Sequence, residues 1–122
     1  MMINSITIIQ FIHLIVYSLL LSCGQFLFKF AALKINTSNL QSFIISTINI
    51  YTIVGFMFFC LSAFLWLFIL KTTPLSIAYP FMALGFLIVP IGSYFFFNET
   101  LSIDYLIGVC LIVTGIYFTL RT

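Results

Sequence analysis

The sequence predicts an all-α, polytopic membrane protein with four transmembrane helices in a single domain, residues 1–122. The 122 residues include only four Lys or Arg and two Asp or Glu, and 64% are hydrophobic. A soluble domain carries about a quarter charged residues. The apolar residues form blocks of about 20, the length of helix that crosses a bilayer core. These blocks do not alternate polar and apolar positions, so they are helices and not barrel strands.

The first predicted span covers residues 6–28. Its start, MMINSITIIQ, has no positive charge, and no small-residue cleavage site follows, so we expect a retained helix and not a signal peptide. The next segment, KINTSNLQSFIISTIN, is half polar. Within it, LQSFIISTI could lie along the membrane interface or extend the second span, which covers residues 50–70.

The third and fourth spans cover residues 75–97 and 101–120, and short turns precede them. Pro74 suits the first helical position of the third span. Ser102 is a candidate N-cap of the fourth, and Asp104 suits the positive end of that helix. Basic residues divide equally between the two sides of the membrane, so the positive-inside rule leaves the orientation open, dual insertion included.

Small residues and prolines predict where these helices pack and bend. Gly108 and Gly115 are seven residues apart, which keeps them on nearly one face of the fourth span. That face could pack within the bundle or form a dimer. In the third span, Pro80, Gly85 and Pro90 indicate a hinge or a static kink. Because four helices hardly enclose a substrate path, we expect a dimer.

A polar stripe follows the first span. Ser18, Ser22, Gln25 and Lys29 fall within about 60° of one another at 100° per residue. Polar groups are costly in hydrocarbon, so the stripe should face other helices or a wet cavity. Gln25 could bind a polar head group and Lys29 a phosphate. An interhelical hydrogen bond for Gln25, and snorkelling of Lys29 to the interface, remain alternatives.

Other chemistry has little support in the sequence. His13 lies roughly opposite the stripe and is a candidate proton carrier, since no carboxylate occurs within a span. No nucleophile and base, phosphate-cradling loop or metal-ligand spacing is present, so we expect no enzyme activity, metal or cofactor. The small, dispersed net charge gives no support for nucleic-acid binding. We expect Cys23, Cys60 and Cys110 to be small buried hydrophobes.

Three motifs together resemble the drug/metabolite transporter superfamily, particularly its four-helix members. They are PLSIAYP (74–80), ETLSIDYLIG (99–108) and GVCLIVTG (108–115). Small multidrug resistance exporters are similar in their four-span plan and in the glycine pair of the fourth helix. Those exporters carry an essential glutamate three residues before the glycine that matches Gly24. Leu21 stands at that position here, and Met82 stands in the place of a tryptophan.

The stretch GQFLFKFA (24–31), with PLSIAYP, looks instead like the small subunits that flip 4-amino-4-deoxy-arabinose linked to undecaprenyl phosphate. The resemblance implies transport of a lipid-linked sugar across a bacterial inner membrane by a homodimer or heterodimer of such subunits. It implies that Gln25 and Lys29 contact the head group, while Ser18, Ser22, Tyr79 and the Pro80 bend shape the path. An exporter of cationic or aromatic compounds and a non-transporting membrane partner remain alternative hypotheses.

Overall fold

The computed structural model describes residues 6–121, so the first five residues and the last residue of the predicted domain lie outside the described part. Every regular element in this part is an α-helix. The helices are α1 (Ile8–Ala32), α2 (Leu40–Thr47), α3 (Ile50–Thr72), α4 (Leu75–Met82), α5 (Gly85–Phe97) and α6 (Ile103–Arg121). The all-α prediction is confirmed.

Three segments of the described chain are long and apolar enough to cross a membrane: Ile8–Ala32, Ile50–Thr72 and Leu75–Phe97. The fourth predicted span corresponds to a shorter apolar helix, Ile103–Thr119 within α6. With 19 residues, α6 is about 28 Å long at 1.5 Å per residue, close to the thickness of a bilayer core. The chain is therefore a polytopic helical membrane protein by length and composition.

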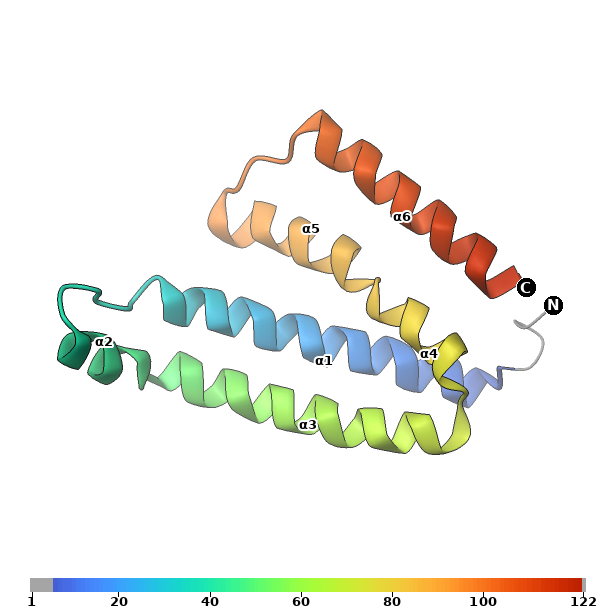
Figure 1. Cartoon of the computed structure of the whole chain (residues 1–122), viewed down its shortest axis with the longest axis horizontal. Coiled ribbons are helices and arrows are strands. Elements are labelled where there is room, and N and C mark those ends of the chain that lie inside the picture. Colours follow the sequence, from blue (N-terminus) through green and yellow to red (C-terminus); the bar gives the residue numbers. More distant parts are fainter. Residues whose placement is uncertain (1–5, 122) are drawn as a thin grey trace.

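The long helices α1 and α3 lie side by side and antiparallel, and they form the tightest part of the fold (Figure 1). Glycines allow this close approach. A Cβ added at Gly24 would lie 2.9 Å from the ring of Phe59, and one added at Gly55 would lie 2.8 Å from the ring of Phe28. The two phenylalanine rings stack with their centroids 4.9 Å apart. Each helix thus places a ring over the glycine of the other.

A small core lies where α1, α3 and α4 meet. Leu14, Tyr17, Ile69, Ala78 and Phe81 form this cluster. The Tyr17 ring stacks on Trp66 at 4.7 Å. Most other large apolar side chains in the described chain are exposed, as expected of surfaces that lipid or other helices cover. The prediction for the cysteines was wrong, because Cys23, Cys60 and Cys110 are all exposed.

The third predicted span, residues 75–97, is interrupted, because Ala83 and Leu84 separate α4 from α5 within it, between two of the residues predicted to bend it. At this break the N–H groups of Ala83 and Leu84 bond to the carbonyls of Pro80 and Phe81, three residues back, at 3.1 Å. This tighter spacing replaces the α-helical ladder. The break lies between Pro80, which lacks an N–H, and Gly85. A proline and a glycine on either side explain why the helix is interrupted here.

The connecting segments have side-chain caps that the sequence partly predicts. LQSFIISTI does not extend the second span, because Asn49 caps α3 by accepting a hydrogen bond from the N–H of Thr52 at 3.1 Å. The Ser102 hydroxyl accepts from the N–H of Tyr105 at 3.1 Å, which confirms that cap. Pro74 precedes α4 as its N-cap, one position earlier than predicted. Asn98 ends α5 in the left-handed conformation.

Helix α6 stands apart from the rest of the chain (Figure 1). Among the residues of α6 whose burial the structure describes, only Gly108, Val109 and Ile116 are half-buried, and the others are exposed. A Cβ added at Gly108 or Gly115 would meet nothing within 4 Å, whereas one added at Gly92 of α5 would clash with the ring of Phe26. The small residues of α6 therefore do not serve packing within the described chain.

Candidate functional site

A groove runs between α1 and the α5 and α6 pair, and three adjoining hollows make it up. The middle hollow, about 320 Å³, is lined by Leu21, Ser22, Gln25, Met82, Gly85, Phe86, Val89, Pro90 and Tyr105. A second, about 220 Å³, continues from Gln25 to Lys29 and Glu99. A third, about 360 Å³, extends from Val89 and Pro90 to the loop before α6. The middle hollow is lined mainly by apolar side chains and is called the apolar end of the groove. The second hollow, with Lys29 and Glu99, is its charged end.

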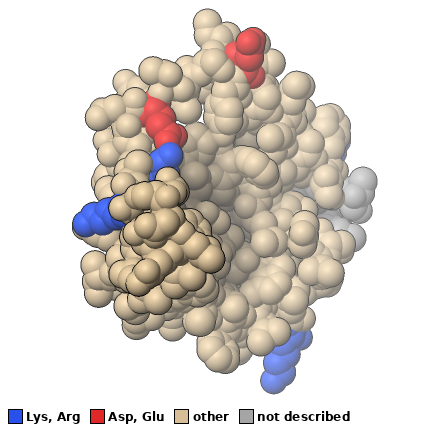
Figure 2. All heavy atoms as spheres, turned by 60° about the vertical axis from the view of Figure 1, so that its left-hand side comes forward, with Lys and Arg blue, Asp and Glu red and all other residues tan. Residues whose placement is uncertain are grey.

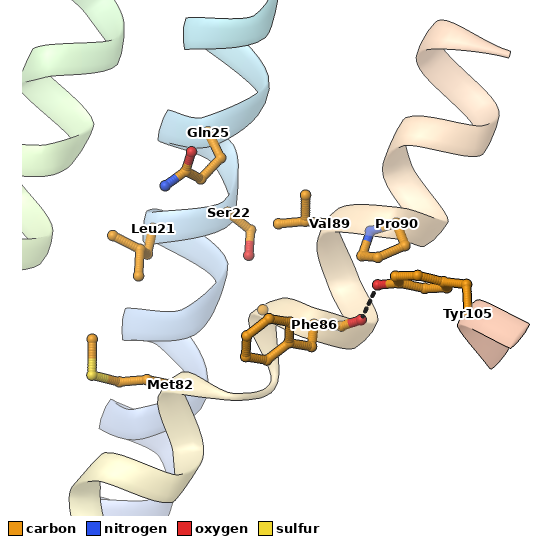
Figure 3. Close-up of a pocket in the computed structure, with 9 residues that line it drawn as sticks. Leu21, Ser22, Gln25, Met82, Phe86, Val89, Pro90 and Tyr105 are labelled. Atoms are coloured by element: carbon orange, nitrogen blue, oxygen red, sulfur yellow. Dashed lines mark hydrogen bonds between the residues drawn. The ribbon is translucent and has the colours of Figure 1, made fainter. Parts of the chain in front are cut away.

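Tyr105 closes one side of the groove through a hydrogen bond that Pro90 makes available. Pro90 has no N–H, so the carbonyl of Phe86, four residues earlier, lacks its helical partner. The Tyr105 hydroxyl donates to that carbonyl at 3.2 Å, and Figure 3 shows it reaching from α6 toward α5. This bond joins the start of α6 to α5. Tyr105 was not predicted from the sequence, although a proline leaves the carbonyl four residues before it without its helical donor.

The charged end of the groove holds an ion pair. Lys29 Nζ lies 3.0 Å from Glu99 Oε1, and the side chains are 47% and 45% exposed. Figure 2 shows few charged side chains on a largely uncharged surface, with one acidic and one basic group in contact and the surface hollowed beside them. Hydrogen bonding from the Lys29 ammonium holds the pKa of Glu99 below its ordinary value, so the carboxylate stays charged at neutral pH. Glu99 was not predicted from the sequence as a site residue.

The four residues of the predicted stripe divide into two groups. Gln25 is exposed and lines both the middle and the charged hollows. Lys29 is at the charged end. Both therefore face the groove, as predicted. No hydrogen bond joins the Gln25 amide to another side chain or backbone group of the described residues, so its donors and acceptor are available.

The two serines of the stripe are buried, at 2% exposed for Ser18 and 3% for Ser22. The Ser18 hydroxyl lies 3.0 Å from the carbonyl of Leu14 and 3.1 Å from that of Phe81, at the break between α4 and α5. The Ser22 hydroxyl donates to the Ser18 carbonyl at 2.8 Å, within its own helix. Ser22 still lines the middle hollow. Ser18 instead links α1 to the helix break.

The other predicted residues lie around the groove in different ways. Tyr79 is 62% exposed and lines a separate hollow between α4 and α6, with Pro80 and Met82. Gly85 and Pro90 line the middle hollow. His13 is half-buried, and its ring contacts Phe68 of α3 edge-on at 5.3 Å. His13 and Tyr79 are therefore not brought together with Gln25 and Lys29, and their predicted roles stay predictions.

The fold and the groove define a class of protein: a polytopic helical membrane protein whose helices border a cleft with an apolar and a charged end. Leu21 lines this cleft. The sequence has two acidic residues. Glu99 is at the charged end, and Asp104 is in the first turn of α6.

Comparison with known proteins identifies the family. The chain is 30% identical over 109 residues to the "probable 4-amino-4-deoxy-L-arabinose-phosphoundecaprenol flippase subunit ArnE" of Proteus mirabilis (strain HI4320), covering 87% of this chain and 92% of the relative. It is 40% identical over 52 residues to the protein of that name from Enterobacter sp. (strain 638), covering 43% of this chain and 49% of the relative. It thus spans about half the length of the Enterobacter relative.

A relative of the same name from Erwinia tasmaniensis is 41% identical over 51 residues, covering 42% of this chain and 47% of that relative. No protein-family model matches the chain. No solved structure gives a significant match. The long alignment with the Proteus protein shows that the chain belongs to the family of ArnE flippase subunits.

Proposed function

We propose that this chain is one subunit of a flippase that moves a polyprenyl-phosphate-linked aminosugar across the bacterial inner membrane. The observation that carries the proposal is the alignment along nearly the whole chain with the Proteus relative, whose name describes this activity. The groove supports it, because its two ends differ in polarity. An amphiphilic substrate needs both kinds of surface.

The groove suggests how the substrate is held. The lipid-linked aminosugar has a polar head group, and its polyprenyl tail is apolar and remains in the bilayer. At the charged end, the Lys29 ammonium binds the phosphate, as a point charge with three donors. The free amide of Gln25 lies between the two hollows and hydrogen-bonds sugar hydroxyls. Leu21, Met82 and Phe86 face the first isoprene units.

A second subunit completes this groove in the proposal. The relatives are named as subunits, and the described chain supplies walls of the groove from α1, α5, the end of α4, the loop before α6 and the start of α6. The exposed face of α6, with open space beside Gly108 and Gly115, supports association with a similar four-helix chain, in a homodimer or a heterodimer. A bend at the α4–α5 break would let one part of the transporter move against the other.

The test measures on which face of the membrane the lipid-linked aminosugar lies. Bacteria that make the lipid, with their own flippase subunit deleted, are converted to spheroplasts and treated with a membrane-impermeant amine reagent. We expect labelling of the lipid to require this chain and to be lost in Lys29→Ala. Lys34→Ala is the matched control, because Lys34 lies beyond α1 with its ammonium over the Tyr51 ring. Equal labelling with and without the chain would refute the proposal.

A further inference from the structure

The Lys29–Glu99 ion pair has a position that packing does not explain. The two residues come from α1 and from the loop between α5 and α6, and their charged atoms are 3.0 Å apart. Each side chain remains about half exposed at the edge of the charged hollow. Exposed ion pairs contribute little to stability because water screens them and the side chains lose freedom. The pair is therefore better placed to meet a ligand than to hold the fold.

We propose that this ion pair is the recognition site for a zwitterionic head group, in which Glu99 binds the ammonium of the aminosugar and Lys29 binds the phosphate. The inference rests on the proposed function and adds to it a second charged residue and a basis for selectivity. An aminosugar phosphate carries one group of each sign. Such a head group can bind both side chains at once, its phosphate taking the place of Glu99 beside Lys29 and its ammonium taking the place of Lys29 beside Glu99.

The exchange leaves no charge without a partner. When the ligand is absent, Lys29 and Glu99 neutralise each other. When a zwitterion enters, each side chain exchanges its partner for a ligand group of the same charge, so the cost of separating the pair is offset. Hydrogen bonding from Lys29 keeps the pKa of Glu99 low, so the carboxylate is ready to accept an ammonium at neutral pH.

The same geometry discriminates against other lipids. A polyprenyl phosphate without the amine would bind Lys29 through its phosphate. Glu99 would then be left without a cation, close to the negatively charged phosphate, and the two would repel each other. An N-acetylated aminosugar has no ammonium to offer Glu99. Phosphatidylethanolamine has both charges but lacks the sugar hydroxyls that the free Gln25 amide can bind at the next position along the groove.

The experiment measures binding by the full chain, with its partner subunit where one co-purifies, in a nonionic detergent. The probes are a polyprenyl-phosphate aminoarabinose, its N-acetylated form, the polyprenyl phosphate alone and phosphatidylethanolamine. We expect the amine form to bind up to about fivefold more tightly than the acetylated form, because an exposed charge pair contributes at most about 1 kcal/mol. Glu99→Gln should bring this ratio to about one.

Two further variants separate recognition from a loss of structure. Lys29→Gln breaks the same ion pair but should weaken binding of both sugar lipids and keep the preference for the amine. Asp104→Asn removes the other acid of the chain and should leave the ratio unchanged, because Asp104 is not among the residues that line the groove. A ratio near one in the wild type, an unchanged ratio in Glu99→Gln, or equally tight binding of phosphatidylethanolamine would overturn the assignment.

The two proposals fail in different ways. If the aminosugar lipid is flipped but the amine is not preferred, only the role of Glu99 is wrong. If the amine is preferred in binding but the sidedness of the lipid does not depend on the chain, the flippase function is wrong and the binding site stands.

Discussion

Replacing Ser18 and Ser22 by alanine, one at a time, separates structural hydroxyls from ligand-binding ones. The two serines are matched, because both are on α1 and both are nearly fully buried. Ser18 donates toward the Phe81 carbonyl at 3.1 Å, across the interface with α4. Ser22 donates only to a carbonyl of its own helix. Ser18→Ala should therefore destabilise the fold more than Ser22→Ala.

The structure sets the size of this difference. Interhelical hydrogen bonds in membrane proteins contribute about 0.6 kcal/mol on average and about 1.7 kcal/mol at most. The Phe81 carbonyl keeps a second donor, the N–H of Leu84 at 3.1 Å, so the loss in Ser18→Ala should be near the average. Ser22→Ala removes a hydroxyl that bonds only within its own helix, so no interhelical hydrogen bond is lost and we expect a smaller change than in Ser18→Ala.

The assay is reversible unfolding in mixed micelles of lipid and detergent, with the free energy of unfolding as the readout. Transport of the lipid-linked aminosugar is measured on the same variants at a temperature where both are folded. If Ser18→Ala unfolds like the wild type but loses transport, the hydroxyl serves the substrate, and a structural role for Ser18 is wrong. A larger loss of stability in Ser22→Ala would contradict the reasoning equally.

Three other predictions concern contacts of the groove and of α6. Tyr105→Phe removes the donor to the Phe86 carbonyl that Pro90 leaves without a helical partner. The free energy of protection against hydrogen exchange in the first turns of α6 should therefore fall by about 0.6 kcal/mol. Unchanged exchange would contradict this. Gly108→Leu should change the unfolding free energy of the isolated chain by no more than about 0.5 kcal/mol, because a Cβ added at Gly108 meets open space. The same variant should reduce cross-linking to a second four-helix subunit. Unaltered cross-linking would show that α6 is not part of the proposed interface. The Glu99 carboxylate has a lowered pKa, so the ion pair should persist at pH 5 and be lost only as the pH falls through a value below the ordinary pKa of about 4.3. A carbon-13 titration of the carboxyl group checks this, and Lys29→Ala should return the midpoint toward the ordinary value; the same midpoint in both proteins would show that Lys29 does not hold the carboxylate.

The helices of this fold could be predicted well from the sequence. The bilayer thickness sets the length of each span, and the need to pair backbone polar groups in lipid restricts an apolar span to a helix. The three longest spans lie within a few residues of their predicted positions. A bend in the third span was predicted, but its position at Ala83 and Leu84 was not, because two prolines and a glycine indicate bending without fixing which turn opens. The exposed cysteines were missed for a related reason. In a helix that is apolar all round, periodicity does not separate lipid-facing from buried positions.

The candidate site was predicted in part. The position of Gln25 and Lys29 on one face of α1 follows from the helical period. That Ser18 and Ser22 point at buried backbone carbonyls does not, because the same face meets both α4 and the groove. Glu99 and Tyr105 come from distant parts of the chain. Only the packing of helices brings them to α1 and α5, and no local pattern encodes that contact.

The loose attachment of α6 bears on the order in which this protein is assembled. Helix α6 is synthesised after α1, α3, α4 and α5, which can already have formed their glycine contacts in the bilayer. A chain stopped after Phe97 would keep the core around Leu14 and Ile69. Because α6 has open space beside Gly108 and Gly115, it can still pack against a neighbouring chain after that core has formed.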